Sequence, residues 1–137
     1  TAVSSTVVTD RDHLETDFTT TSSTLVNIPG LSLSVTTGAN PVMIGIATTV
    51  DNSSANDVVA MNFDIDSGTL VMGTIGPAPI QEVAGKRMNL SMVARTVALT
   101  AAAHTITAQT RNSTTGTVTI NANASFATNF WVVEVSD

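Results

Sequence analysis

The residues best suited to chemistry in this 137-residue chain gather near its N-terminus. His13 lies among the carboxylates Asp10, Asp12, Glu15 and Asp17. These residue types bind metals or transfer protons when their side chains converge in space. A contiguous run of charges is more often a solvated face or an electrostatic contact. We therefore predict that this segment contacts a partner and holds no metal.

Two further groups carry the oxygen atoms that calcium prefers. Asn62, Asp64 and Asp66 alternate along one predicted strand, so they share a face. The loop 51–57 is rich in Asp and Asn, but it lacks the Gly at the sixth position and the Glu at the twelfth that an EF-hand requires. We expect solvated polar surfaces at both places and no metal site.

Nothing else in the sequence forms a recognisable catalytic set. His104 stands at the start of a predicted strand, far along the chain from His13, and no Ser-bearing nucleophile elbow is present. The chain has no cysteine, which excludes thiol catalysis, disulfides and thiolate zinc sites. We expect a structural role for His104, no catalytic residue, no cofactor and no enzymatic activity.

Charge narrows the choice of partners. Five basic and eleven acidic residues give a net charge of −6, which disfavours nucleic acid and anionic membranes. Lys86 and Arg87 adjoin a glycine-rich connection and suit a contact with an acidic neighbour. A surface pair that keeps this loop soluble is the equally consistent alternative.

The overall composition predicts one folded, β-rich domain. Hydrophobic residues make up 42% of the chain and charged residues only 12%, unlike a disordered chain. The chain contains 24 threonines and 17 valines, and β-branched residues favour strands over helices.

Period-two alternation and turn residues divide the chain into strands. The segment 42–50 is almost continuously apolar or small, which predicts a central strand. The segment 73–87 is rich in Gly and Pro and predicts a long connection, with a single helical turn conceivable only at 79–85. About eight to ten short strands without helices predict an antiparallel jelly-roll-like β-sandwich. The predicted strands cover residues 17–28, 31–36, 42–50, 58–66, 89–97, 104–111, 117–122 and 129–135.

The first fifteen residues are predicted to be an extended N-terminal arm, followed by the sandwich domain at 16–137. We expect the arm to lie against a neighbouring subunit or against a capsid surface; the alternative is that it adds a strand to its own sheet. The expected contact residues are Val7, Val8, Asp10, Arg11, Asp12 and His13.

Three stretches of the sequence resemble a known class of domain. They are DFTTTSSTLVNIPGL at 17–31, AAHTITAQ at 102–109 and FWVVEV at 130–135. Together they resemble small jelly-roll domains of tailed-bacteriophage virion proteins, and the resemblance extends over about residues 16–135. Such domains serve as capsid decoration (cement) proteins or as knobs of head and tail fibres, and they are similar in form to the trimeric tumour-necrosis-factor and C1q heads.

The resemblance implies a non-enzymatic decoration protein that forms a homotrimer on the outer surface of the capsid. Its partner would be the major capsid protein, and its place would be the virion. The absence of shaft repeats favours this interpretation over a fibre. The alternative is a receptor- or glycan-binding knob that uses the loops 73–87 and 51–57, although aromatic residues are only 4% of the chain.

Overall fold

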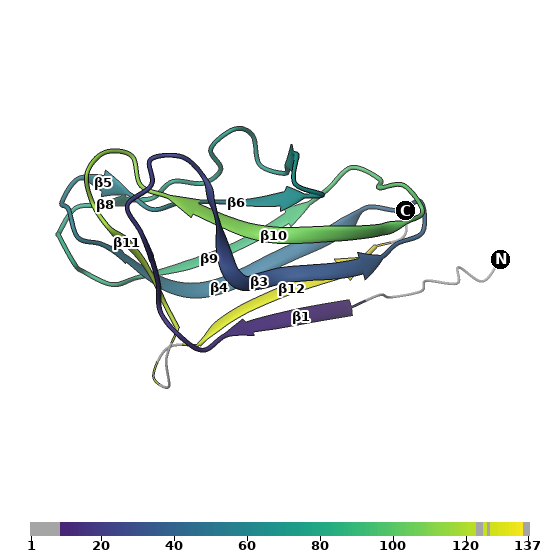
Figure 1. The fold of residues 1–137 in the computed structure, drawn as a ribbon, viewed down its shortest axis with the longest axis horizontal. Coiled ribbons are helices and arrows are strands. Elements are labelled where there is room, and N and C mark those ends of the chain that lie inside the picture. Colours follow the sequence, from purple (N-terminus) through teal and green to yellow (C-terminus); the bar gives the residue numbers. More distant parts are fainter. Residues whose placement is uncertain (1–8, 123–124, 126, 136–137) are drawn as a thin grey trace.

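The computed structural model of the chain describes residues 9–122, 125 and 127–135, and this part contains strands and no helix (Figure 1). It therefore contains no helix that could cross a membrane. The strands are β1 (Thr9–Leu14), β2 (Phe18–Thr20), β3 (Val26–Thr36), β4 (Val42–Asn52), β5 (Asp57–Val58), β6 (Ala60–Ile65), β7 (Thr69–Leu70), β8 (Ile80–Gln81), β9 (Met88–Arg95), β10 (Ala103–Arg111), β11 (Val118–Asn121) and β12 (Thr128–Glu134).

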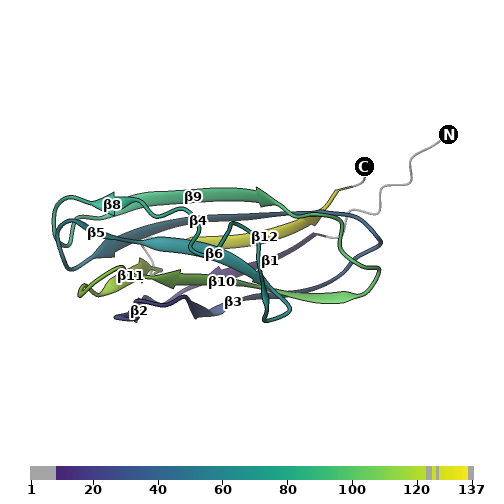
Figure 2. The ribbon, with the colours of Figure 1, turned by 90° about the horizontal axis from the view of Figure 1, so that it is seen from above.

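Eight of these strands form two facing antiparallel sheets with the order of a jelly roll. One sheet runs β1-β12-β4-β9 and the other runs β3-β10-β6-β7. The chain passes from one sheet to the other at almost every connection, which is how two Greek keys close a sandwich. Figure 2 shows the two layers, with β9, β4 and β12 over β6, β10 and β3. The predicted all-β, jelly-roll-like sandwich is confirmed.

The central strand of the first sheet is β4, as its apolar sequence predicted. On one side it pairs with β9, and on the other it pairs first with β12 and then with β11. β2 continues the sheet beyond β11. β5 and β8 form a two-stranded ribbon.

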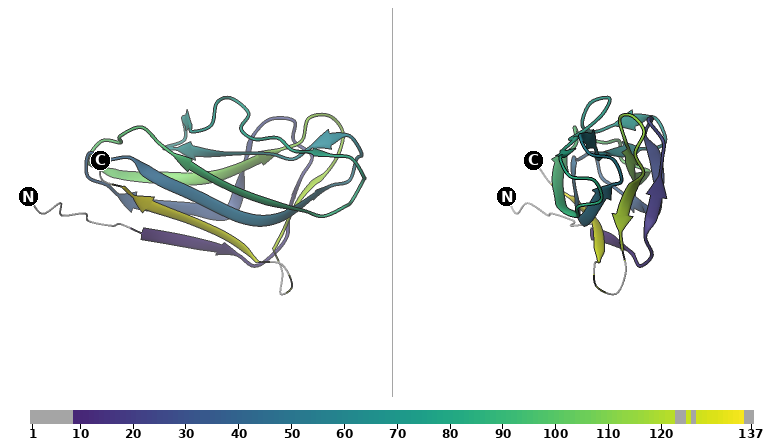
Figure 3. Two further views of the ribbon diagram at one scale, coloured as in Figure 1. Left: turned by 180° about the vertical axis from the view of Figure 1, so that it is seen from behind. Right: turned by 90° about the vertical axis from the view of Figure 1, so that its left-hand side faces the viewer.

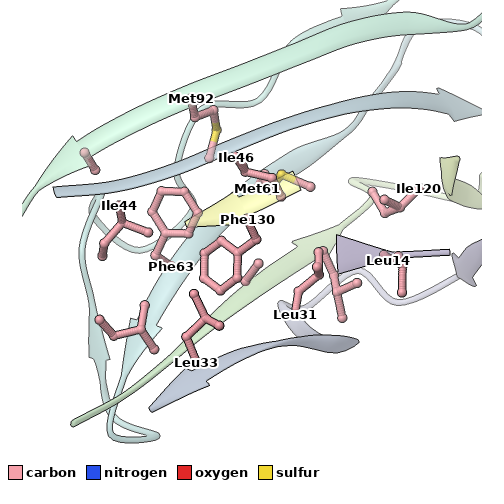
Figure 4. Close-up of a cluster of buried hydrophobic side chains, with 14 of the residues drawn as sticks. Leu14, Leu31, Leu33, Ile44, Ile46, Met61, Phe63, Met92, Ile120 and Phe130 are labelled. Atoms are coloured by element: carbon pink, nitrogen blue, oxygen red, sulfur yellow. The ribbon is translucent and has the colours of Figure 1, made fainter. Parts of the chain in front are cut away.

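The core lies between the two sheets and is built from their inward-facing side chains (Figure 4). Leu31, Leu33 and Val35 alternate with exposed residues along β3, as predicted. Phe63 of β6 and Phe130 of β12 stack across the sandwich with ring centroids 5.8 Å apart. Stacked aromatic pairs contribute stability beyond that of the apolar area they bury, so this contact helps to hold the two sheets together.

Part of the segment predicted to be an N-terminal arm, residues 9–14, forms a strand of the sandwich instead. Residues 9–14 form β1, which pairs antiparallel with β12 along its whole length, and Leu14 is buried. Figure 3 shows β1, β12 and β4 side by side. The alternative placement, a strand added to the protein's own sheet, therefore holds for these residues. Backbone hydrogen bonds pair an edge strand whatever its side chains are, so a charged sequence did not prevent it.

The connection 73–87 is long, as predicted, but it contains no helical turn. Its segment 79–85 instead carries the short strand β8, and Gly85 has a φ of +68°. Gln81 in β8 is fully buried and uses its side chain to hold neighbouring loops. A helix here would have withdrawn that side chain from its partners.

Candidate functional site

His104 and Asp66 form an ion pair at one end of the sandwich. His104 Nδ1–H donates to Asp66 Oδ2 at 2.7 Å, and His104 Nε2–H donates to the Thr100 carbonyl oxygen at 2.9 Å. The second Asp66 oxygen accepts the Thr105 N–H at 2.8 Å. The imidazole thus joins the β6–β7 turn to the connection before β10. Its two acceptors require a proton on each ring nitrogen.

The surroundings stabilise the charged forms of both groups. The hydrogen bond to Asp66 and then that to Thr100 raise the pKa of His104, against the opposing effect of burial. The hydrogen bond from His104 lowers the pKa of Asp66. Asp66 and Ser67 have φ angles of +55° and +57°, and side-chain contacts of this kind hold a turn in the left-handed region. The predicted structural role of His104 agrees with this geometry.

The acidic face predicted at 62–66 is solvated only at Asp66, whose side chain is 50% exposed. Asn62 and Asp64 are buried, because the chain after β7 covers the outer face of β6. Asn62 donates to the Gly73 carbonyl oxygen at 2.8 Å and accepts from the Met72 N–H at 3.1 Å. Burial raises the pKa of Asp64, and this outweighs the hydrogen bonds from three backbone N–H groups of the β6–β7 turn. The expectation of a solvated surface is wrong for Asn62 and Asp64, because the chain that follows β7 folds back over the strand.

The loop 51–57 contributes a buried carboxylate that binds backbone groups. Asp57 accepts hydrogen bonds from the Ser113 N–H and hydroxyl, the Thr114 hydroxyl and the Gly116 N–H, at 2.5 to 3.1 Å. Burial raises the pKa of Asp57, but the hydrogen bonds, led by those from Ser113, outweigh burial and leave it well below its ordinary value. Asp57 therefore anchors the β10–β11 turn.

A second buried pair, Asn52 and Gln81, completes this end of the molecule. The Asn52 N–H donates to Gln81 Oε1, and Gln81 Nε2 donates to the Asn52 carbonyl oxygen, both at 2.6 Å. Asn52 Nδ2 also donates to the Val58 carbonyl oxygen at 3.0 Å. The Gln81 Oε1 atom and the carbonyl oxygens of Asn52 and Val58 therefore already accept hydrogen bonds from within the protein. No group of three or more His, Asp or Glu residues in the described part of the chain is placed to hold a metal ion.

The structure separates the residues predicted to contact a partner. Asp10, Arg11, Asp12 and His13 lie in β1, opposite 132, 131, 130 and 129 of β12 respectively. Val7 and Val8 lie outside the described residues. Lys86 and Arg87 are exposed in the turn between β8 and β9, which belongs to a different part of the sheet from β1.

The outer face of the sheet β1-β12-β4-β9 carries apolar side chains that sequence analysis did not single out. Trp131 and Val133 of β12 and Met43 of β4 are half-buried there, and Val93 of β9 is 59% exposed. Trp131 lies over Gly45, since a Cβ at that position would collide with the indole ring. The sequence signal was Val93, an apolar residue among the polar residues at the other outward positions of β9.

The other sheet is hollowed on its outer face, which sequence analysis also missed. Two adjoining hollows, of about 260 and 410 Å³, share Leu25 and Leu70 as lining residues. Gln109 of β10 lines the first hollow and Arg111 of β10 lines the second. The sequence indicated only that Gln109 and Arg111 occupy outward positions of β10. The other residues that line the hollows come from segments distant in sequence.

No protein-family model matches the chain, and no curated protein matches it. Similar solved structures come from infectious bursal disease virus. They include the virus of the Gx strain, at 10% identity and a TM-score of 0.40, and T=1 particles derived from the virus, at 11% identity and a TM-score of 0.42. The alignments cover 93% and 95% of this chain but only 39% and 40% of the viral chains. The chain thus spans about two fifths of the proteins it matches, and a likeness at this level carries no conclusion about function.

Proposed function

We propose that this chain is a structural virion protein of a bacteriophage, a decoration (cement) protein that trimerises on the outer surface of the capsid and binds the major capsid protein. Exposed apolar side chains on the outer face of the sheet β1-β12-β4-β9 carry the proposal. Val93 of β9 is 59% exposed, and Trp131 of β12 lies on the same face as Val93. A contiguous apolar face on a soluble domain favours a contact with another protein.

The composition supports burial of such a face. Charged residues make up only 12% of the chain, so few ions lose their hydration when subunits associate. The resemblance of the sequence to phage jelly-roll domains supports the virion as the place of assembly. The buried polar groups described above are used for internal hydrogen bonds, which favours a structural protein over an enzyme.

We assign the capsid contact to the N-terminal segment and to the β8–β9 turn. The contact residues proposed are Val7, Val8, Asp10, Arg11, Asp12 and His13, with Lys86 and Arg87 as a second contact. Three copies of each in a trimer would add multivalent attachment.

The first test is the native mass in solution, by light scattering on a sizing column. The expected mass is three times the 14.1 kDa of one chain. Val93→Glu should give a folded monomer, because it places a charge in the proposed interface. Val83→Glu is the matched control: Val83 is 56% exposed but lies between β8 and β9, so this variant should remain trimeric. A monomeric parent protein, or trimers of both variants, would contradict the proposal.

The second test separates attachment from folding. Deletion of residues 1–8 leaves β1 in place and should weaken co-sedimentation with capsids that lack this protein, without changing the thermal unfolding midpoint. Deletion of residues 1–14 removes β1 and leaves β12 without a partner on that side, so it should lower the midpoint as well. Undiminished attachment after the shorter deletion would contradict the assignment to Val7 and Val8.

A further inference from the structure

A groove crosses the outer face of the sheet β3-β10-β6-β7. Its two hollows, of about 260 and 410 Å³, meet at Leu25 and Leu70. Ile75, which is 42% exposed, adds a third apolar side chain. Both hollows are shallow and open to solvent.

The outward side chains of β10 contribute to the groove, and the β10 backbone cannot take part in binding. Ile106, Ala108 and Thr110 point into the sandwich, so Gln109 and Arg111 point outward. β10 lies between β3 and β6 and pairs with both. Its N–H and C=O groups are therefore committed to those strands, and an extended peptide cannot bind here by adding a strand. Recognition must come from side chains.

Arg111 supplies positive charge at one end. Its Nη1 donates to the Ser23 carbonyl oxygen at 2.7 Å, which holds the guanidinium in place. Its Nε is buried without an acceptor. Among the described residues no carboxylate pairs with this guanidinium. Because Nε is buried, a carboxylate in the hollow would bind the terminal Nη groups of this arginine, through charge-assisted hydrogen bonds.

Amide groups and a carboxyl group line the other hollow. Gln109 Nε2 donates to Asn27 Oδ1 at 2.8 Å, which orients the pair. The Gln109 amide oxygen remains as an acceptor, and the second Gln109 N–H and the Asn27 NH₂ group remain as donors. Asp64 lies opposite residue 107 of β10, four residues from Arg111, or roughly 13 Å along the strand. Its negative charge is therefore well separated from the guanidinium.

We propose that this groove binds a carboxylated saccharide. The carboxylate would bind Arg111, hydroxyl or acetamido groups would bind the Gln109–Asn27 pair, and the C–H faces of the sugar rings would contact Leu25 and Leu70. A saccharide fits better than an acidic peptide because its hydroxyls bind side-chain amides and need no free strand edge. The proposal does not depend on the decoration role, and it specifies a ligand for the alternative function, a glycan-binding knob.

The test is saturation-transfer NMR on the full chain with sialyllactose and, as the neutral match, lactose. Sialyllactose should receive saturation, strongest on its acidic sugar, and lactose should bind about tenfold more weakly. Arg111→Gln should weaken sialyllactose binding by a similar factor. Arg95→Gln is the control, since Arg95 lies on β9 of the other sheet, and it should bind as the parent does.

A second pair of variants keeps the test decisive if Arg111→Gln fails to fold. Ile75→Asp places a negative charge in the groove and should repel the ligand. Val83→Asp places the same charge at an exposed apolar residue outside the groove and should have no effect. The proposal is overturned if sialyllactose gives no saturation transfer at millimolar concentration, if lactose binds equally, or if Arg111→Gln and Ile75→Asp leave binding unchanged. Binding of an Asp/Glu peptide without binding of sialyllactose would also overturn it.

Discussion

Asp57 is buried and yet held in its charged form, because the turn between β10 and β11 directs backbone N–H groups and hydroxyls at it. Hydrogen bonds to an ionised group are worth more than those between neutral groups, and loss of one partner leaves the other groups unsatisfied. The carboxylate therefore acts as the structural centre of this end of the molecule. A calcium ion would have had to compete with those donors.

Asp57→Asn should destabilise the protein by about 2–4 kcal/mol, since the new amide group opposes N–H donors with donors of its own. Urea unfolding at pH 7 measures the change. Asp51→Asn is the matched control, because Asp51 is half-exposed and receives one amide hydrogen bond, from Asn121. This variant should lose less than about 1 kcal/mol of unfolding free energy. Equal losses would contradict the anchoring role.

The Asp57→Asn variant also predicts how the stability of the protein depends on pH in the acid range. The native pKa of Asp57 is lowered from 3.8, so its contribution is present above that value and is lost as the pH falls through the native pKa. The stability gap between the parent and Asp57→Asn should be constant from pH 7 to about 4 and shrink below it. A gap that grows in acid would contradict this assignment.

His104 makes the opposite prediction. Its native pKa is raised above 6.5, so its contribution is complete below that pH and is lost as the pH rises through the native pKa. Neutral imidazole can donate to Asp66 or to Thr100 but not to both. His104→Gln should cost about 1 kcal/mol more at pH 5.5 than at pH 9, as measured by urea unfolding. The difference should shrink in an Asp66→Asn background, in which only the hydrogen bond to Thr100 still raises the pKa of His104; an undiminished difference there would mean that another group is responsible.

At the scale of elements, β4 depends on a glycine where a larger residue would be expected. Gly45 lies in the middle of this central strand and gives Trp131 of β12 room to cover it. The continuous apolar run correctly predicted a central strand. It did not predict that a tryptophan from the last strand would occupy the outer face.

Gly45→Ala should destabilise the protein by about 1–3 kcal/mol, because the methyl group would displace the indole ring. Trp131 is the single tryptophan of the chain, so its fluorescence emission should shift to the red. Gly68→Ala is the control, since a Cβ there meets nothing within 4 Å, and both readouts should stay near the parent values. An unshifted emission spectrum for Gly45→Ala would contradict the placement of the ring.

β1 is an element that the alternation of apolar and polar residues could not predict. Its residues are charged and show no apolar alternation, so the segment resembled an arm. Pairing with β12 depends on backbone groups and on a partner strand more than a hundred residues later in the chain. The buried outer face of β6 was missed for the same kind of reason, because the cover comes from the chain after β7.

At the scale of the whole molecule, the stack of Phe63 on Phe130 connects the two sheets. Phe63→Ala should destabilise the protein by about 3–5 kcal/mol, as measured by urea unfolding. Phe18→Ala is the control on the half-buried β2, outside the sandwich interior, and it should cost clearly less. Similar losses in the two variants would contradict the central role of the stack.

The amino-acid sequence alone determined the fold class, the approximate limits of most strands and the central place of β4. These features depend on local properties: β-branched residues favour strands, alternation marks a half-buried strand, and Gly, Pro and Asn mark turns. The tertiary structure alone decided where β1 pairs, which segment buries the outer face of β6, and where the side chain of Trp131 lies. It also decided the hydrogen-bond partners of Asp57 and His104 and the groove along β10. Most of these features join residues far apart in the chain, and only the closing of the two sheets brings those residues within contact distance.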